Sequence, residues 1–447
     1  MKFFLFFLVI GFEFFGAQYI LYTDYQAFLL YSLFIVINAF FIWNFINKSI
    51  LKTNIIYVFT FIAWLSYNAL GFIHTSAIQQ LRNIPREDWI LWIYFLLILS
   101  SFLIYIPIKI MQNINFHSVS FLKNFVIHPQ TIILLICIGF ALNLYKIHIA
   151  GGLESFINAA YGAKVESSYM TFFNLFIGIT SNIIFIILPY MFLKQKSLIK
   201  ILAIIYLLFY IIIGCLNGSS MSIMTPVIAL FTYALFMTKK ANTKKKLKRF
   251  FIIGLTVGIV GGMLIRVNRK HDKEFTIHNI EQAFNEIITS ATFDNVTNLQ
   301  YILGHMEPIN QPQQFILPYV HYLPRNIFTW KPVELGRIIG YKHVGVNKDS
   351  KVAFLSSPIG DFYYDFGLIG IILGMLFVGF FIGYIQEKLN TLPQSPFILS
   401  IIIAFSLQFT GLSAWYTGCF TAIVRLLILY FMVILIEKII SLKKQYY

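Results

Sequence analysis

Long apolar runs dominate the chain and are separated by short polar segments. The runs are 15 to 22 residues long, and an α-helix needs about 20 residues to cross the hydrocarbon core of a bilayer. The runs are continuous rather than alternating, so they do not suit the strands of a membrane barrel. The runs that qualify are 3–22, 25–46, 54–73, 89–110, 130–149, 171–192, 198–216, 221–237, 251–265, 364–385, 397–414 and 418–439. The pattern predicts an all-α, polytopic integral membrane protein with about 12 transmembrane helices.

A long polar segment interrupts this pattern near the C-terminal end. The predicted organisation is an N-terminal membrane bundle (1–265) with a small loop at 150–170, a large loop (266–363), and C-terminal membrane helices (364–447). Most of the side chains able to perform chemistry lie in the large loop. We therefore expect the membrane helices to serve as a scaffold that presents it.

Local signals give the large loop a coarse structure. Apolar residues at helical spacing predict one helix at 276–291 and a second, shorter one at 294–304. Prolines then recur at 308, 312, 318, 324 and 332, which favours turns over long helices. The loop should form a lid or rim over one face of the membrane bundle.

Composition supports the membrane assignment. Hydrophobic residues make up 58% of the chain and charged residues 12%, with a mean hydropathy of +0.76, whereas soluble domains carry roughly 25% charged residues. The segment 239–249 is lysine-rich and contains no acidic residue, which predicts a cytoplasmic location for it. Alternation along the chain then places both termini in the cytoplasm and the large loop outside.

The net charge of +16 comes in large part from such topology-setting lysines, which meet anionic lipid and do not indicate nucleic-acid binding. Topology does not require a cationic loop outside, so an anionic substrate such as a lipid diphosphate would explain it. The basic residues of the loop that suggest such a substrate are Arg266, Arg269, Lys270, Arg325, Lys331 and Arg337.

The sequence predicts neither a metal site nor a cofactor. The three cysteines, Cys137, Cys215 and Cys419, lie in or beside apolar runs without paired spacing. No nucleotide-binding glycine motif or zinc-protease motif is present.

Arg425 lies inside the apolar run 418–439, where an ionisable residue is costly and commonly functional. If its role were only structural, Glu13 in the first run would be a candidate partner. The pairs Gly370–Gly374, Gly379–Gly383 and Gly254–Gly258 have a spacing of four residues that allows helices to approach closely.

Three stretches resemble one family in their order and placement. They are PRNIFTWKP at 324–332, SSPIGDFYYDFGLIGIILGMLFVGFFIGY at 356–384, and GGLESFINAAYGAKVES at 151–167. The chain resembles the O-antigen or oligosaccharide repeat-unit polymerases (Wzy type), and the separation of Arg325 from Gly336 also suits that family. It departs from many relatives at Gly218-Ser219-Ser220, which lacks a following arginine, and at Lys164, where an arginine is usual.

The resemblance implies a GT-C-like glycosyltransferase of the bacterial inner membrane with one large periplasmic loop. The growing glycan would pass from undecaprenyl diphosphate to an undecaprenyl-diphosphate-linked repeat unit, with membrane lipids and a chain-length-regulating copolymerase as further partners. Guanidinium groups suit a departing diphosphate. The expected diphosphate-binding residues are Arg266, Arg325, Arg337, Lys331 and Arg425.

Deprotonation of the attacking sugar hydroxyl calls for a general base, and His321, His343 and Asp361 are the candidates near these cations. Most candidates have a structural alternative: Arg266 as an interfacial anchor, Arg325 as the cap of a turn, Asp361 as a helix cap, and Arg337, Lys331 and His321 as solvated loop groups. Two other functions stay open, an O-antigen ligase and a flippase or transporter of lipid-linked oligosaccharide.

Overall fold

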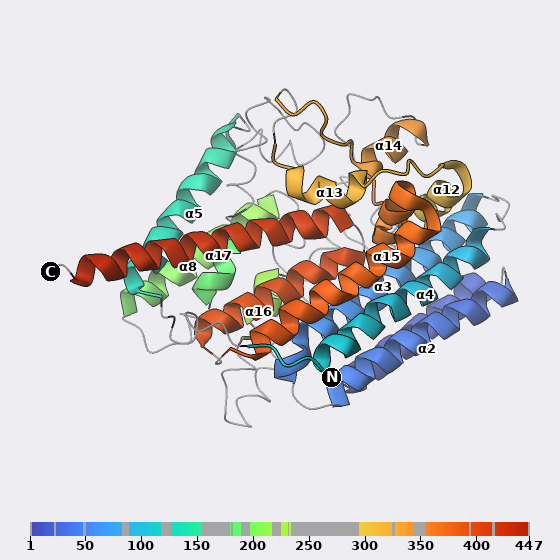
Figure 1. Ribbon diagram of the computed structural model, residues 1–447, viewed down its shortest axis with the longest axis horizontal. Helices are drawn as coiled ribbons and strands as arrows, with labels where there is room; N and C mark the ends of the chain where they lie inside the picture. The colour runs from blue at the N-terminus through green and yellow to red at the C-terminus, as the bar shows by residue number, and fades with distance from the viewer. Residues whose placement is uncertain are drawn as a thin grey trace, which may run out of the picture.

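The computed structural model describes a helical protein (Figure 1). It describes residues 2–21, 24–47, 51–82, 89–117, 125, 127–149, 151–153, 179, 182–188, 197–216, 225–230, 232–233, 295–323, 327–343, 345, 354–392, 395–413 and 416–445. Within these ranges every regular element is a helix, which confirms the all-α prediction.

Six helices are long and apolar enough to cross a membrane, and three shorter apolar helices accompany them in the described part of the chain. The longer ones are α2 (Tyr25–Asn47), α3 (Leu51–Arg82), α4 (Trp89–Gln112), α5 (Pro129–Ile149), α15 (Ser357–Asn390) and α17 (Tyr416–Gln445). The shorter ones are α1 (Lys2–Gly16) continued by η1 (Ala17–Leu21), α8 (Ser197–Leu216), and α16 (Pro396–Phe409) continued by η4 (Thr410–Ser413). The predicted spans 171–192, 221–237 and 251–265 lie wholly or largely outside the described residues.

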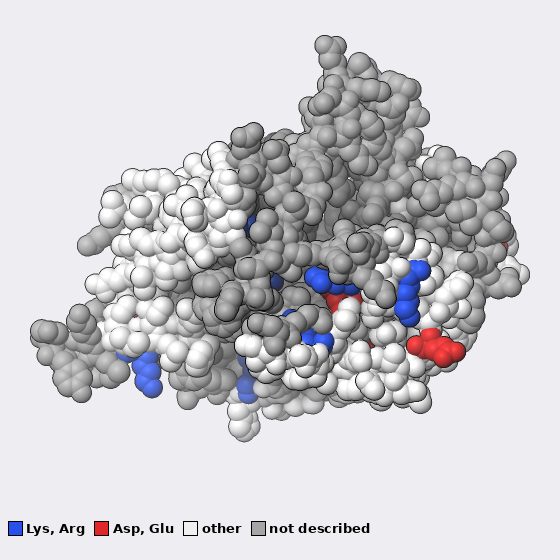
Figure 2. Space-filling model, turned by 90° about the horizontal axis from the view of Figure 1, so that it is seen from above, with Lys and Arg blue, Asp and Glu red and all other residues white. Residues whose placement is uncertain are grey.

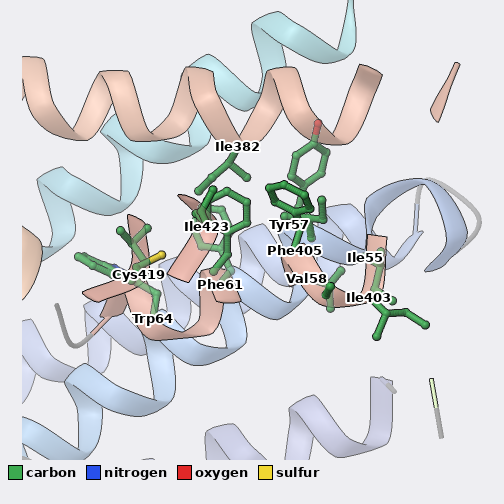
Figure 3. Packing of buried hydrophobic residues seen from close by; sticks show 14 of the residues in the cluster. Ile55, Tyr57, Val58, Phe61, Trp64, Ile382, Ile403, Phe405, Cys419 and Ile423 are labelled. Carbon is green, nitrogen blue, oxygen red and sulfur yellow. The ribbon is translucent and has the colours of Figure 1, made fainter. Parts of the chain in front are cut away.

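The helix α3 lies at the centre of the bundle. It packs against α2, α15 and α16, and α4 in turn packs along α15. Figure 3 shows side chains of α3, among them Phe61 and Trp64, packed with Ile382 of α15 and Ile423 of α17. Such interdigitation of fully buried aromatic and branched side chains fixes the relative positions of the helices.

Buried polar side chains join the helices where lipid would otherwise leave polar groups unpaired. Ser101 on α4 accepts hydrogen bonds from Asn38 of α2 (3.1 Å) and from Trp64 of α3 (3.0 Å). Such bonds between membrane helices contribute on the order of 1 kcal/mol each. They tie α2, α3 and α4 into one unit.

Three short helices lie at one end of the bundle, which we call the loop end: α12 (Asn295–His305), α13 (Gln313–Val320) and α14 (Leu335–Lys342) (Figure 1). The helix α12 confirms the helix predicted at 294–304. The helix predicted at 276–291 lies outside the described residues, as does the small loop at 150–170 beyond residue 153.

The helix α12 docks on the loop-end half of α3. Asn295 donates to Asn68 Oδ1 (3.1 Å), and the hydroxyl groups of Thr75 and Thr297 lie 3.0 Å apart. The approach is close because α3 has a glycine there: a Cβ on Gly71 would lie 2.5 Å from Asn295 Oδ1 and 2.8 Å from Val296 Cγ2.

The helix α15 begins earlier than predicted and is bent. It starts at Ser357 rather than at residue 364, because the polar stretch before the apolar run is helical as well. The bend falls at Phe366 and Gly367, where Gly367 has a φ of 63°, a conformation that glycine adopts with little strain. The bend frees the carbonyl groups of Tyr364 and Asp365, which accept the N–H groups of Ile309 (2.9 Å) and Gln311 (3.1 Å).

The glycine pairs of α15 serve two kinds of contact. Gly379 and Gly383 face α4, where an added Cβ would meet Ile104 O at 2.6 Å and Met111 Cβ at 2.8 Å. Gly370 and Gly374 instead face Phe362, beyond the bend of the same helix. The predicted close approach of two helices is therefore confirmed for Gly379 and Gly383, whereas Gly370 and Gly374 make room for a residue of their own helix. Gly254 and Gly258 lie outside the described residues.

We predict that Gly71→Ala will destabilise the protein by about 1–3 kcal/mol, because overpacking would push α12 away from α3. The measurement is the thermal unfolding of the detergent-purified protein. Gly11→Ala is the matched control, since a Cβ on this helical glycine of α1 would meet nothing within 4 Å. Equal melting temperatures for the two variants would contradict the packing argument.

Candidate functional site

The short helix α13 is held at both ends by charged side chains. At its N-terminus the carboxylate of Asp365, on α15, accepts the N–H groups of Gln314 and Phe315, each at 2.8 Å. Just beyond its C-terminus the ammonium of buried Lys331 donates to the carbonyls of His321 and Leu323, the latter at 3.1 Å. Negative charge at the N-terminus and positive charge at the C-terminus both complement the helix dipole.

Gln314 connects α13 to the start of α14. Its side chain is fully buried, donates to Val333 O (2.9 Å) and accepts the N–H of Leu335 (3.0 Å). One amide therefore satisfies two backbone groups where the chain enters α14. The two short helices are coupled through it.

Arg425 is the cation that the fold places within an apolar helix. It lies on α17 and is half-buried; its Nε donates to the hydroxyl of Tyr322, and its guanidinium lies 5.4 Å from the centroid of the Tyr322 ring. Tyr322 in turn donates to Thr421 O at 3.3 Å. Within the described residues the two terminal amino groups of Arg425 have no partner, and no carboxylate forms an ion pair with it.

The partner of Arg425 therefore differs from the candidate named from the sequence. Glu13 accepts a hydrogen bond from Ser32 of α2 at 2.7 Å, whereas Arg425 contacts Tyr322. Apolar periodicity cannot reveal this contact, because Tyr322 lies in a loop segment remote from α17 in sequence.

Tyr322 is a neutral group in this setting. Burial raises the pKa of Tyr322, and the neighbouring Arg425 guanidinium partly offsets the rise. The phenol therefore keeps its proton near neutral pH and holds the guanidinium without neutralising it. The positive charge of Arg425 stays available to an anion.

His321 belongs to the same cluster. It follows α13 directly, its carbonyl accepts a hydrogen bond from Lys331, and its ring meets the ring of Tyr322 edge-on at 5.3 Å. The structure thus brings together His321, Lys331 and Arg425 of the predicted site residues, with Tyr322 between them. Lys331 contributes to this cluster through its hydrogen bonds to the carbonyl groups of His321 and Leu323.

A second group, of mixed charge, surrounds the start of α14. Asp361 is fully buried on α15, and its Oδ1 accepts the hydroxyl of Ser356 at 2.5 Å. Asp365 and Glu334 are its acidic neighbours. Arg337, about one-third exposed, lies 3.9 Å from Glu334 through its Nε. Figure 2, which looks onto the loop end, shows basic side chains gathered around acidic ones there.

Asp361 does not cap the helix that follows, because α15 has already begun at Ser357. Asp365 is the carboxylate that caps a helix here, and the sequence analysis did not single it out. The Phe-Gly pair that follows Asp365 could have indicated the bend in α15. The helix that Asp365 caps, α13, was harder to predict because Pro312 and Pro318 favour turns.

His343 lies in a different setting from His321. Its ring stacks on Tyr301 of α12 at 4.0 Å, and His305 stacks on Tyr301 at 5.1 Å. This exposed group of three rings joins the end of α14 to α12. Arg266 and Arg325 lie outside the described residues, so their predicted roles stay predictions.

We predict that Lys331→Met will loosen α13, because the carbonyls of His321 and Leu323 lose their donor, at up to about 1–3 kcal/mol per group left unsatisfied. Hydrogen exchange measured by mass spectrometry should rise in residues 313–323. Lys342→Met, which removes an exposed lysine at the end of α14, is the control and should leave that exchange unchanged. Unchanged exchange in both variants would refute the capping role.

Comparison with known proteins gives no match: no protein-family model, no curated protein and no solved structure is significantly similar to this chain.

Proposed function

We propose that the chain is an integral-membrane glycosyltransferase, an O-antigen or surface-polysaccharide polymerase. It would transfer the growing glycan from undecaprenyl diphosphate onto an incoming undecaprenyl-diphosphate-linked repeat unit. The observation that carries the proposal is Arg425, a guanidinium inside an apolar helix that is oriented by a neutral phenol and has no carboxylate partner among the described residues. A charge in that position is costly unless an anion compensates it.

The anion that fits is a diphosphate attached to a membrane lipid. Arginine presents two parallel N–H groups to phosphate oxygens, and the terminal amino groups of Arg425 supply such a pair. A lipid substrate also reaches this depth naturally, because its apolar chain stays in the bilayer while its diphosphate meets the protein.

In the proposed reaction, a hydroxyl oxygen of the acceptor sugar attacks the anomeric carbon of the donor glycan. The bond from that carbon to the diphosphate oxygen breaks, and the electron pair leaves with undecaprenyl diphosphate. Guanidinium groups stabilise the charge that develops on the leaving oxygen. We assign this role to Arg425, with Arg337, Arg325 and Arg266 as the further cations expected from the resemblance.

The proton of the acceptor hydroxyl needs a base, and His321 is the candidate best placed for this role. Its half-buried ring lies against Tyr322, beside Arg425. Asp361 is fully buried behind Ser356, and His343 is stacked on Tyr301. Of the three candidate bases, His321 combines exposure with proximity to the arginine.

The first test is glycan length on a gel, in a strain that lacks the gene and is complemented at matched expression. Wild type should restore a ladder of repeats, and Arg425→Ala should reduce polymer by about 100-fold, as expected for loss of a group that stabilises developing negative charge. Arg425→Lys keeps the charge but loses the paired donors, so it should retain an intermediate ladder.

Lys342→Ala, at the exposed end of α14, is the control cation and should give the wild-type ladder. Gel filtration of purified Arg425→Ala protein separates loss of chemistry from loss of folding. A strain lacking the gene should still show single capped repeats. If it lacks even these, the function is ligation or transport; if Arg425→Ala polymerises normally, the site assignment is wrong.

A further inference from the structure

The exposed apolar residues of α15 mark where lipid begins. Every described side chain from Ser357 to Phe362 is buried, whereas exposed apolar side chains run from Phe366 to Tyr384. At about 1.5 Å per residue this stripe is about 27 Å long, close to the roughly 30 Å of a hydrocarbon core. The loop-end boundary of the hydrocarbon therefore lies near the bend at Phe366 and Gly367.

The helix α13 starts at that boundary and reaches below it. Its N-terminus is bound to Asp365, next to the bend. The ring of Phe315 packs against Phe377 of α15 at 5.1 Å, and Phe377 lies about 16 Å beyond Phe366 along the helix. The side chains of α13 thus occupy the level of the outer part of the hydrocarbon.

A second membrane helix also contacts this segment. Tyr322, just after α13, contacts Thr421 and Arg425 of α17. The exposed apolar stripe of α17 begins immediately afterwards, at Leu427, and continues through Phe431, Leu435 and Ile439. Figure 1 shows α13 beside the first turns of α17, whereas α12 lies by the end of α3.

The outward surface of this segment is apolar. Ile316 and Tyr319 share one face of α13, and the following residues expose Ile327 (69%), Trp330 (60%) and Val333. In the described residues 313–323 and 327–333 the one lysine or carboxylate is Lys331, whose side chain is buried. Among the described residues that follow, charge reaches the surface again on α14, partly at Arg337 and fully at Lys342.

Backbone groups at both ends of α13 are hydrogen-bonded to protein side chains, as a helix in lipid requires. Backbone groups at membrane depth have to be satisfied by protein, because lipid offers no partner. Asp365 supplies acceptors to the N-terminus, and Lys331 supplies donors to the carbonyls after the C-terminus. A helix lying in water would not need two buried charges for this purpose.

We propose that α13 and residues 327–333 form a re-entrant segment of the membrane, with Ile316, Tyr319, Ile327 and Trp330 in contact with the acyl chains of phospholipids in the leaflet at the loop end. The occupant is lipid because the exposed apolar surface lies at the depth of the lipid-facing stripe of α15 and next to the start of the exposed stripe of α17. The proposal does not depend on the reaction that the protein performs.

The test is spin-label electron paramagnetic resonance on the full chain in phosphatidylcholine vesicles, with the three native cysteines replaced by alanine. Labels at Ile316→Cys and Ile327→Cys should collide with oxygen at least several times more readily than with a water-soluble nickel chelate. Leu373→Cys, on the exposed stripe of α15, is the membrane control, and Lys342→Cys is the aqueous control.

Labels at 316 and 327 that match Leu373→Cys support the proposal. Collision with nickel at the level of Lys342→Cys would place the segment in water and overturn it. Protection from both oxygen and nickel would show that protein, such as a second copy of the chain, covers the surface, and this also overturns it. The two controls give the collision ratios expected at a membrane position and at an aqueous position of the same protein.

Discussion

The packing of the loop end depends on the carboxylate of Asp365, which lies beside the bend in α15. Gly367 bends α15 and separates a short, largely buried first part from a longer apolar part. The bend exposes backbone carbonyls and aims Asp365 at the N-terminus of α13, so one turn of helix anchors the segment 309–315 through four hydrogen bonds. Without the bend, α15 would continue straight and α13 would have no anchor at the membrane boundary.

Arg425 differs from the other polar side chains of the described membrane helices in how it is paired. Along the described membrane helices, polar side chains mostly satisfy one another or a backbone carbonyl, as Asn38, Trp64 and Ser101 do. Arg425 differs because its described partner is a phenol that keeps its proton. A neutral partner orients the guanidinium but leaves its charge intact, which is what a reversible anion site in an apolar setting needs.

Hydropathy was a reliable guide where lipid decides the structure. The bounds of α2, α4 and α5 agree with the apolar runs, because each run has to be buried in the bilayer. The first half of α15 was missed because protein, chiefly α12, buries it instead of lipid, so it carries no apolar run. The helix α13 was missed because Pro312 and Pro318 suggest turns. Proline is tolerated in so short a helix, and bonds from distant residues supply what the local sequence lacks.

The sequence indicates which types of residue form the candidate site but not which of them are in contact. An intramembrane arginine and a histidine near Arg325 are visible in the sequence, whereas the phenol between His321 and Arg425 depends on how the loop packs against α17. The roles of Arg266 and Arg325 rest on the resemblance. Pairings of this kind arise from tertiary contacts between segments about a hundred residues apart, which no local pattern records.

The side chain of Gln314 has a mechanical consequence. Because a single amide joins α13 to both Val333 and Leu335, neither short helix can shift without carrying the other. Any molecule that displaces α13 would therefore also tilt α14 and move Glu334 and Arg337. A displacement on one side of Gln314 would in this way become a rearrangement of the charged pair on the other side.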